Sequence, residues 1–274
     1  MSRSATGSQT ERYACAVNLL PNVVFARNAG QELTLDLFSP TSTKNPPLVL
    51  CIHGGGWISG DKSMYHEEAE WLCYKGYAAA CVSYRLAPMH PFPAAVADVQ
   101  AAVEFLQGGT LSGYDPTRLV SFGNSAGGHL ALMSAVATHR FDGQEAPAPQ
   151  VQGVVSVSGI SDMRDAREKH YDIGMTFLNQ FLGDNYSDET AASASPIAYV
   201  LPSPAPFLLI HGENDDIVPV RESVEMHNAL ISAGVKSELI LMPGEYHSFT
   251  YGAWSRIRTH LFEFLQQHFP YETH

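Results

Sequence analysis

Residues 118–135 read RLVSFGNSAGGHLALMSA. The apolar segment 119–122 leads into a turn that centres on Ser125, and a second apolar segment follows the turn. Gly123 and Gly127 remove side chains that would collide where a strand and a helix converge. Gly and Ser are also ordinary turn residues, so the rest of the chain must decide what this turn does. We predict a strand–turn–helix unit that exposes the Ser125 hydroxyl at the start of the helix, where the helix dipole favours negative charge.

Other apolar segments share the character of 118–122 and alternate with helical patterns. Residues 31–40 alternate apolar and polar side chains, which is typical of a half-exposed strand. Five further segments are apolar throughout, as in strands buried on both faces: they lie in PPLVLCIHGGGW, AAACVSYRLAP, VQGVVSVSG, APFLLIHG and SELILMPG. Helical patterns lie between or after them at 64–75, 94–106, 128–138, 221–233 and 256–268. The alternation predicts an α/β fold, a mainly parallel sheet with helices on both faces, in one domain spanning residues 1–274.

Residues 161–206 interrupt this alternation. The segment is polar, partly helical in pattern (GMTFLNQFLG), and then rich in Ser, Ala and Pro. We expect a small cap-like insertion over the carboxyl edge of the sheet, where α/β proteins bind ligands. An ordinary helix-and-loop crossover is the alternative.

Composition excludes several classes of function. The net charge of −12 disfavours partners such as nucleic acid or anionic membranes. Residues 1–20 lack the apolar stretch of a signal peptide, and no segment has the length of a membrane span. Four cysteines are dispersed without a C-x-x-C spacing. We therefore predict a cytoplasmic protein without a metal or cofactor, whose partner is a small molecule; the oligomeric state is left open.

A serine hydroxyl needs a base that titrates near neutral pH and an acid that orients the base. Of twelve histidines, His247 in LMPGEYHSF follows the last predicted strand and precedes the last helix. That places it in a loop at the carboxyl edge of the sheet. His211, at the end of the preceding strand, is expected to shape its turn.

The acid is expected to come before the histidine in the chain. HGENDDIVP supplies Asp215 and Asp216 directly after a buried strand. We predict Asp215 as the orienting acid, since Asp216 suits the cap of the next helix. Asp162, after VVSVSG, is a third candidate.

The segment HGGGW, residues 53–57, follows a buried strand at the same edge of the sheet. Glycine N–H groups without side chains around them can surround the oxyanion of an acyl-transfer transition state. We predict an oxyanion hole from the N–H groups of Gly55, Gly56 and Ala126. Trp57 and Asn124 are expected at the substrate pocket. The glycine-rich phosphate motifs G-x-x-x-x-G-K-[ST] and G-x-G-x-x-G are absent from the sequence.

HGGGW, GNSAGG, HGENDDIVP and YHSF occur in that order. The set resembles the α/β-hydrolases of the hormone-sensitive-lipase-like esterase group, and GNSAGGHLA also resembles compact feruloyl-type esterases and kynurenine formamidases. The resemblance covers about residue 31 to the C-terminus. It implies an α/β-hydrolase fold and a serine carboxylesterase that hydrolyses small to medium soluble esters through an acyl-enzyme. An arylformamidase with the same triad, Ser125, Asp215 and His247, is the alternative; a non-catalytic ligand-binding protein on this fold is a more distant one.

Overall fold

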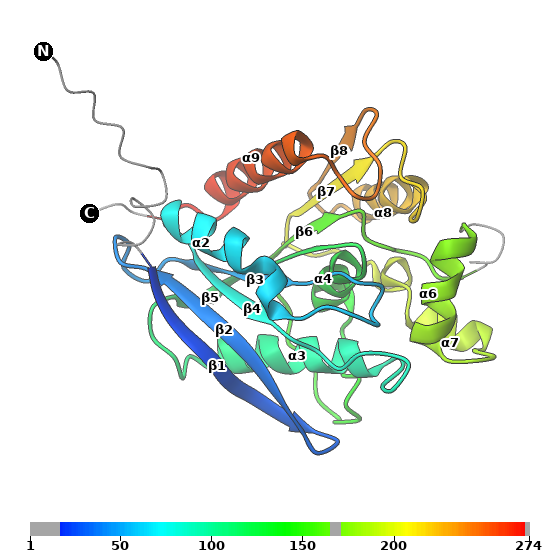
Figure 1. Ribbon diagram of the computed structural model, residues 1–274, viewed down its shortest axis with the longest axis horizontal. Coiled ribbons are helices and arrows are strands. Elements are labelled where there is room, and N and C mark those ends of the chain that lie inside the picture. Colours follow the sequence, from blue (N-terminus) through cyan, green and yellow to red (C-terminus); the bar gives the residue numbers. More distant parts are fainter. Residues whose placement is uncertain (1–16, 165–170, 272–274) are drawn as a thin grey trace, which may run out of the picture.

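A computed structural model describes residues 17–164 and 171–271, and within these ranges the strands form one eight-stranded sheet (Figure 1). The strands are β1 (Val17–Asn28), β2 (Gln31–Pro40), β3 (Pro47–Ile52), β4 (Ala78–Val82), β5 (Asp115–Asn124), β6 (Gly153–Val157), β7 (Phe207–Gly212) and β8 (Ser237–Met242). Their order across the sheet is β1-β2-β4-β3-β5-β6-β7-β8. β2 runs antiparallel to β1 and β4, and the other neighbours are parallel. The predicted mainly parallel α/β sheet is confirmed.

Helices cover both faces of this sheet (Figure 1). The helices and 3-10 turns are η1 (Lys62–Tyr65), α2 (His66–Tyr74), α3 (Ala94–Gln107), α4 (Ala126–Val136), α6 (Asp172–Leu182), α7 (Asp188–Ser193), η2 (Pro196–Tyr199), α8 (Arg221–Ser232) and α9 (Tyr251–His268). α2 and α9 pack on one face, and α3, α4 and α8 pack on the other. β3 shows why its sequence is apolar throughout: Leu48, Leu50 and Ile52 enter one core, and Val49 and Cys51 enter the other.

The first two strands differ from the sequence-based prediction. β1 was not predicted, because none of its residues is buried and its pairing with β2 is irregular between Leu20 and Val23. β2 was predicted as half-exposed, yet Leu35–Pro40 is buried throughout. The polar Asp36 is buried there because its carboxylate accepts from Lys62 at 2.6 Å and lies 2.8 Å from His66 Nε2. Because these partners allow a charged side chain to be buried, the polar residue in the alternating pattern did not mark an exposed face of the strand.

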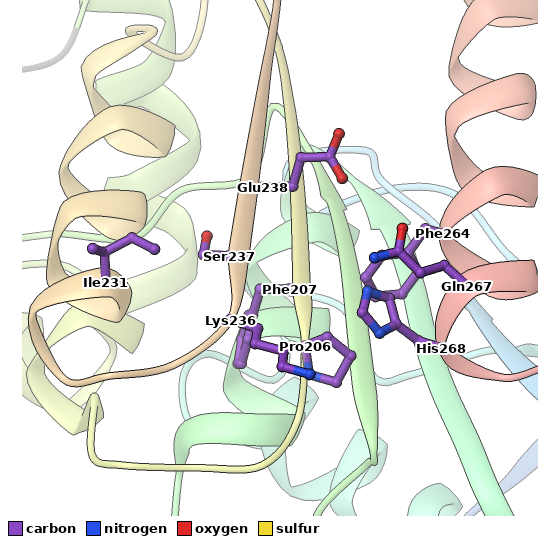
Figure 2. A pocket seen from close by; sticks show the side chains of 9 residues that line it. All are labelled: Pro206, Phe207, Ile231, Lys236, Ser237, Glu238, Phe264, Gln267 and His268. Atoms are coloured by element: carbon purple, nitrogen blue, oxygen red, sulfur yellow. The ribbon is translucent and has the colours of Figure 1, made fainter.

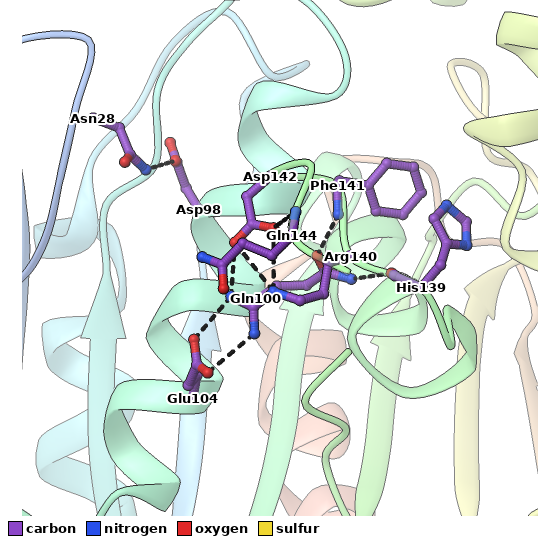
Figure 3. Close-up of polar contacts among 9 residues, drawn as sticks. All are labelled: Asn28, Asp98, Gln100, Glu104, His139, Arg140, Phe141, Asp142 and Gln144. Atoms are coloured by element: carbon purple, nitrogen blue, oxygen red, sulfur yellow. Dashed lines mark hydrogen bonds and ion pairs between the residues drawn. The ribbon is translucent and has the colours of Figure 1, made fainter. Parts of the chain in front are cut away.

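Hydrogen bonds and an ion pair join the segment after α4 to α3 (Figure 3). The side chain of Gln100 donates to the carbonyl of His139 and accepts from the N–H of Phe141, both at 3.0 Å. Arg140 forms ion pairs with Glu104 at 2.9 Å and Asp142 at 2.7 Å. These contacts fix the path of the chain as it leaves α4.

The predicted excursion at 161–206 contains α6, α7 and η2, and its residues 165–170 lie outside the described part of the chain. His129 of α4 connects this excursion to the glycine loop. Its Nε2 donates to the carbonyl of Ala194 at 2.8 Å, and its Nδ1 accepts from Trp57 Nε1 at 3.2 Å. Phe181 of α6 stacks on Trp57 with ring centroids 4.2 Å apart.

His129 must stay neutral to accept from Trp57, and burial lowers its pKa to about 4. An unfolded histidine takes up a proton near pH 6.5, so protons favour the unfolded state and stability falls as the pH falls from there towards 4. Between pH 7 and pH 5 we expect this residue alone to remove about 2 kcal/mol from the free energy of unfolding. The measurement is urea denaturation at both pH values, for the wild type and for His129→Gln.

His129→Gln should be less stable at pH 7 but should lose about 2 kcal/mol less on acidification. Equal losses in the two proteins would contradict the assignment of a buried neutral imidazole.

Candidate active site

Ser125 lies at the turn between β5 and α4, with φ 54° and ψ −123°. This positive φ is strained for a residue with a side chain. Two close approaches of main chain hold the turn. A Cβ on Gly127 would collide with the carbonyl oxygen of Ile52, and a Cβ on Gly123 would collide with the main chain of Gly127. The glycines beside Ser125 are therefore required by packing, as the sequence predicts for a sharp strand–turn–helix connection.

The hydroxyl of Ser125 forms a continuous chain with two distant residues. Its Oγ lies 3.0 Å from His247 Nε2, and His247 Nδ1 lies 2.8 Å from Asp215 Oδ2. The three residues follow β5, β7 and β8, whose parallel arrangement brings their carboxyl ends to one edge of the sheet. The structure thus brings together all three residues that the sequence predicts as catalytic.

Asp215 is the carboxylate at the inner end of this chain. Burial alone would raise its pKa, but hydrogen bonds from His211 and His247 outweigh burial and hold the pKa below its usual range. Its Oδ1 accepts from the N–H groups of Ile217 at 3.0 Å and Val218 at 2.8 Å. The group is therefore an anion that can orient the imidazole and stabilise its protonated form.

The other acidic candidates lie elsewhere. Asp216 is exposed, and it does not cap the next helix, because α8 begins at Arg221 after Val220 and has no side-chain cap bond. Asp162 is buried and its Oδ1 pairs with Arg164 Nε at 2.9 Å. His211 shapes the turn as predicted, since its Nε2 donates to the carbonyl of Val218 at 3.0 Å.

The glycine loop leaves β3 beside the nucleophile. Ile52 pairs with Gly123, and a Cβ on Gly54 would lie 3.5 Å from the Ser125 Cβ. Gly55 and Gly56 have φ of 103° and 62°, so the loop turns in a conformation that favours glycine. Among the described residues, no acceptor bonds to the N–H of Gly55 or Gly56. The first N–H of α4, that of Ala126, has no partner within its helix.

Aromatic and imidazole side chains brace this loop. His53 is buried, stacks on Tyr84 with centroids 4.2 Å apart, and receives the Tyr84 hydroxyl on its carbonyl at 2.9 Å. Trp57 is held by His129 and Phe181. No role could be predicted for Tyr84, His129 or Phe181 from the sequence, because each lies far along the chain from the loop that it supports.

A cavity of about 270 Å³, its mouth included, opens beside Ser125. Its lining consists of Gly56, Trp57, Ser125, Ile160, Gly174, Phe177, Leu178, Ile217 and Val218. Trp57, one of the two residues expected at the substrate pocket, lines this cavity. Asn124, the other expected pocket residue, is not part of the lining, because its Oδ1 accepts from the Tyr65 hydroxyl at 3.0 Å.

A second hollow lies at the opposite edge of the sheet, where β7 and β8 begin (Figure 2). Its charged or titratable side chains belong to Lys236, Glu238 and His268. They lie where the parallel strands β7 and β8 begin, whereas Ser125 lies at the edge where the strands end. Across residues 17–164 and 171–271, no group of three or more His, Cys, Asp or Glu side chains is placed to hold a metal ion. None of the helices in those ranges combines the length and hydrophobicity that a membrane crossing requires.

The chain is similar to proteins named as esterases. Esterase LipQ of Mycobacterium tuberculosis is 28% identical over 241 residues, which cover 84% of this chain and 57% of LipQ. The isoprenylcysteine alpha-carbonyl methylesterase ICME of Arabidopsis thaliana is 27% identical over 231 residues, which cover 78% of this chain and 53% of that protein. The chain thus spans less than two thirds of the length of these relatives.

Solved structures share the fold over nearly the whole chain. An esterase from Thermogutta terrifontis with bound propionate has a TM-score of 0.78 at 20% identity, covering 96% of this chain and 97% of that one. A truncated carbohydrate esterase from gut microbiota has a TM-score of 0.79 at 23% identity, covering 92% and 96%. The predicted α/β-hydrolase fold is confirmed. The BD-FAE family model matches residues 35–230, more than half of the sequence, and the chain therefore belongs to the BD-FAE family.

Proposed function

We propose that the protein is a serine carboxylesterase with Ser125 as nucleophile, His247 as general base and Asp215 as orienting acid. The observation that carries the proposal is the unbroken chain of contacts, 3.0 Å from Ser125 Oγ to His247 Nε2 and 2.8 Å from His247 Nδ1 to Asp215 Oδ2. Each distance lies within the reach of a hydrogen bond that can transfer or orient a proton.

The reaction follows from these contacts. Ser125 Oγ attacks the ester carbonyl while its proton passes to His247 Nε2. The tetrahedral intermediate then collapses, the alcohol leaves with that proton, and an acyl-enzyme remains on Ser125. Water repeats the sequence, with His247 taking the proton of water and returning it to Ser125 as the acid departs. Asp215 stays ionised throughout, which its lowered pKa supports.

The oxyanion hole is proposed to consist of the N–H groups of Gly55, Gly56 and Ala126. The contact of the loop with the Ser125 turn supports this role, as does the absence of acceptors for the two glycine N–H groups within the described ranges. Removing one such donor raises the free-energy barrier of the reaction by about 3–4 kcal/mol. The main-chain packing that imposes a positive φ on Ser125 also holds its hydroxyl beside the glycine loop.

The substrates are proposed to be small to medium, uncharged esters. A chain of net charge −12 disfavours acidic molecules, and the names of the relatives, all esterases, support ester hydrolysis. No observation favours the arylformamidase alternative. The residues of 161–206 that line the cavity support a cap-like role for that segment. The cytoplasmic location stays a prediction.

Ser125→Ala removes the nucleophile, and we expect kcat/KM on 4-nitrophenyl acetate to fall by about 10⁴-fold or more. Asp215→Asn leaves the imidazole without an anionic partner and should lower kcat by about 10³–10⁴-fold. The exposed neighbour supplies a matched control: Asp216→Asn should change either constant by less than about twofold. The two kinetic constants are compared between purified variants whose circular dichroism spectra match that of the wild type.

Turnover by Ser125→Ala near the wild-type rate would refute the proposed nucleophile. A loss in Asp216→Asn as large as that in Asp215→Asn would refute the choice of acid.

A further inference from the structure

The walls of the cavity beside Ser125 are apolar and held in place. Ile217 and Val218 form one side, and their N–H groups are bound by Asp215 Oδ1. Trp57 forms another side and is fixed by His129 and by the Phe181 ring. No lining side chain carries a charge. A charged group entering this space would lose its water without gaining a partner, so the cavity suits an uncharged aliphatic group.

Helix α6 limits the length of this cavity. Phe177 lies so close to the glycine loop that a Cβ on Gly56 would be 2.5 Å from Phe177 Cδ1. Leu178, on the same helix, adds a second apolar wall. The space is small, about 270 Å³ with its open mouth included. The Phe177 ring therefore leaves room for only a short chain.

The position of His247 decides which half of an ester enters. The leaving alcohol receives its proton from His247 Nε2, so it must lie on the histidine side of Ser125. Neither His247 nor its neighbours line the cavity, and the adjacent Tyr246 is 55% exposed. The cavity thus lies away from the leaving group, and the alcohol side faces solvent.

We propose that this cavity binds the acyl half of the substrate and that Phe177 restricts it to short, uncharged aliphatic acyl groups, from acetyl to butyryl, while the size of the alcohol is not restricted. The assignment rests on the proposed esterase function.

Chain-length profiles test the role of Phe177. For 4-nitrophenyl esters of the wild type, kcat/KM should rise by up to about fourfold per methylene towards butyrate. It should then fall by at least about tenfold at octanoate, because overpacking opposes a longer chain. Phe177→Ala should raise the octanoate-to-acetate ratio by at least about tenfold, and Phe177→Leu should raise it less. Thr176→Ala, an exposed change one residue away, should leave the profile unchanged.

Two isomeric esters test the assignment of the halves. Cyclohexylmethyl acetate carries its ring on the alcohol, and ethyl cyclohexanecarboxylate carries it on the acyl group. With each rate divided by that of alkaline hydrolysis, the first should have a kcat/KM within about threefold of ethyl acetate, and the second should be at least about 30-fold lower. Reaction is followed by titration of the released acid.

Wild-type turnover of octanoate or ethyl cyclohexanecarboxylate as fast as of the acetates would overturn the acyl assignment. An unchanged profile in both Phe177→Ala and Phe177→Leu would overturn the role of Phe177. In either case, loss of activity in Ser125→Ala would leave the esterase proposal standing, so the two failures are distinguishable.

Discussion

The carbonyl oxygen of Ile52 leaves no room for a side chain on Gly127, and the rest of the site depends on that approach. It lets the end of β3 lie against the turn between β5 and α4. The glycine loop that continues β3 therefore begins beside Ser125, and the Ser125 backbone is held at a positive φ. A single methyl group at position 127 would separate the loop from the nucleophile. The geometry of the site therefore depends on this main-chain packing.

Asp215 couples the other parts of the site. One carboxylate oxygen faces His247, and the second binds the N–H groups of Ile217 and Val218. The group that orients the base therefore also positions one wall of the cavity. At another wall, His129 joins Trp57 to the segment containing α7. Asp215 thus supports both a cavity wall and the hydrogen-bonded chain to Ser125. Because the Trp57 wall is held as well, the cavity is expected to keep a fixed size.

Much of this could be predicted from the sequence, because strands buried on both faces and glycine-rich turns have strong local patterns. The fold and the residues now found around Ser125 follow from motif order and from the geometry of parallel strands. β1 could not be predicted, because this edge strand has no buried residues and therefore no alternation of buried and exposed side chains. Asn124 was expected at the pocket from its place beside Ser125, but its side chain turns to Tyr65. Phe177 could not be assigned, since its contact with Gly56 depends on tertiary packing over more than a hundred residues.

We propose that His247 activates the Ser125 hydroxyl. The most direct test is mass spectrometry of the folded protein after treatment with a fluorophosphonate, which reacts with activated serines. Activation of Ser125 by His247 predicts one adduct per chain, located on the peptide that contains Ser125 and absent from Ser125→Ala. A folded, unlabelled wild-type protein, or an adduct on another serine, would contradict it.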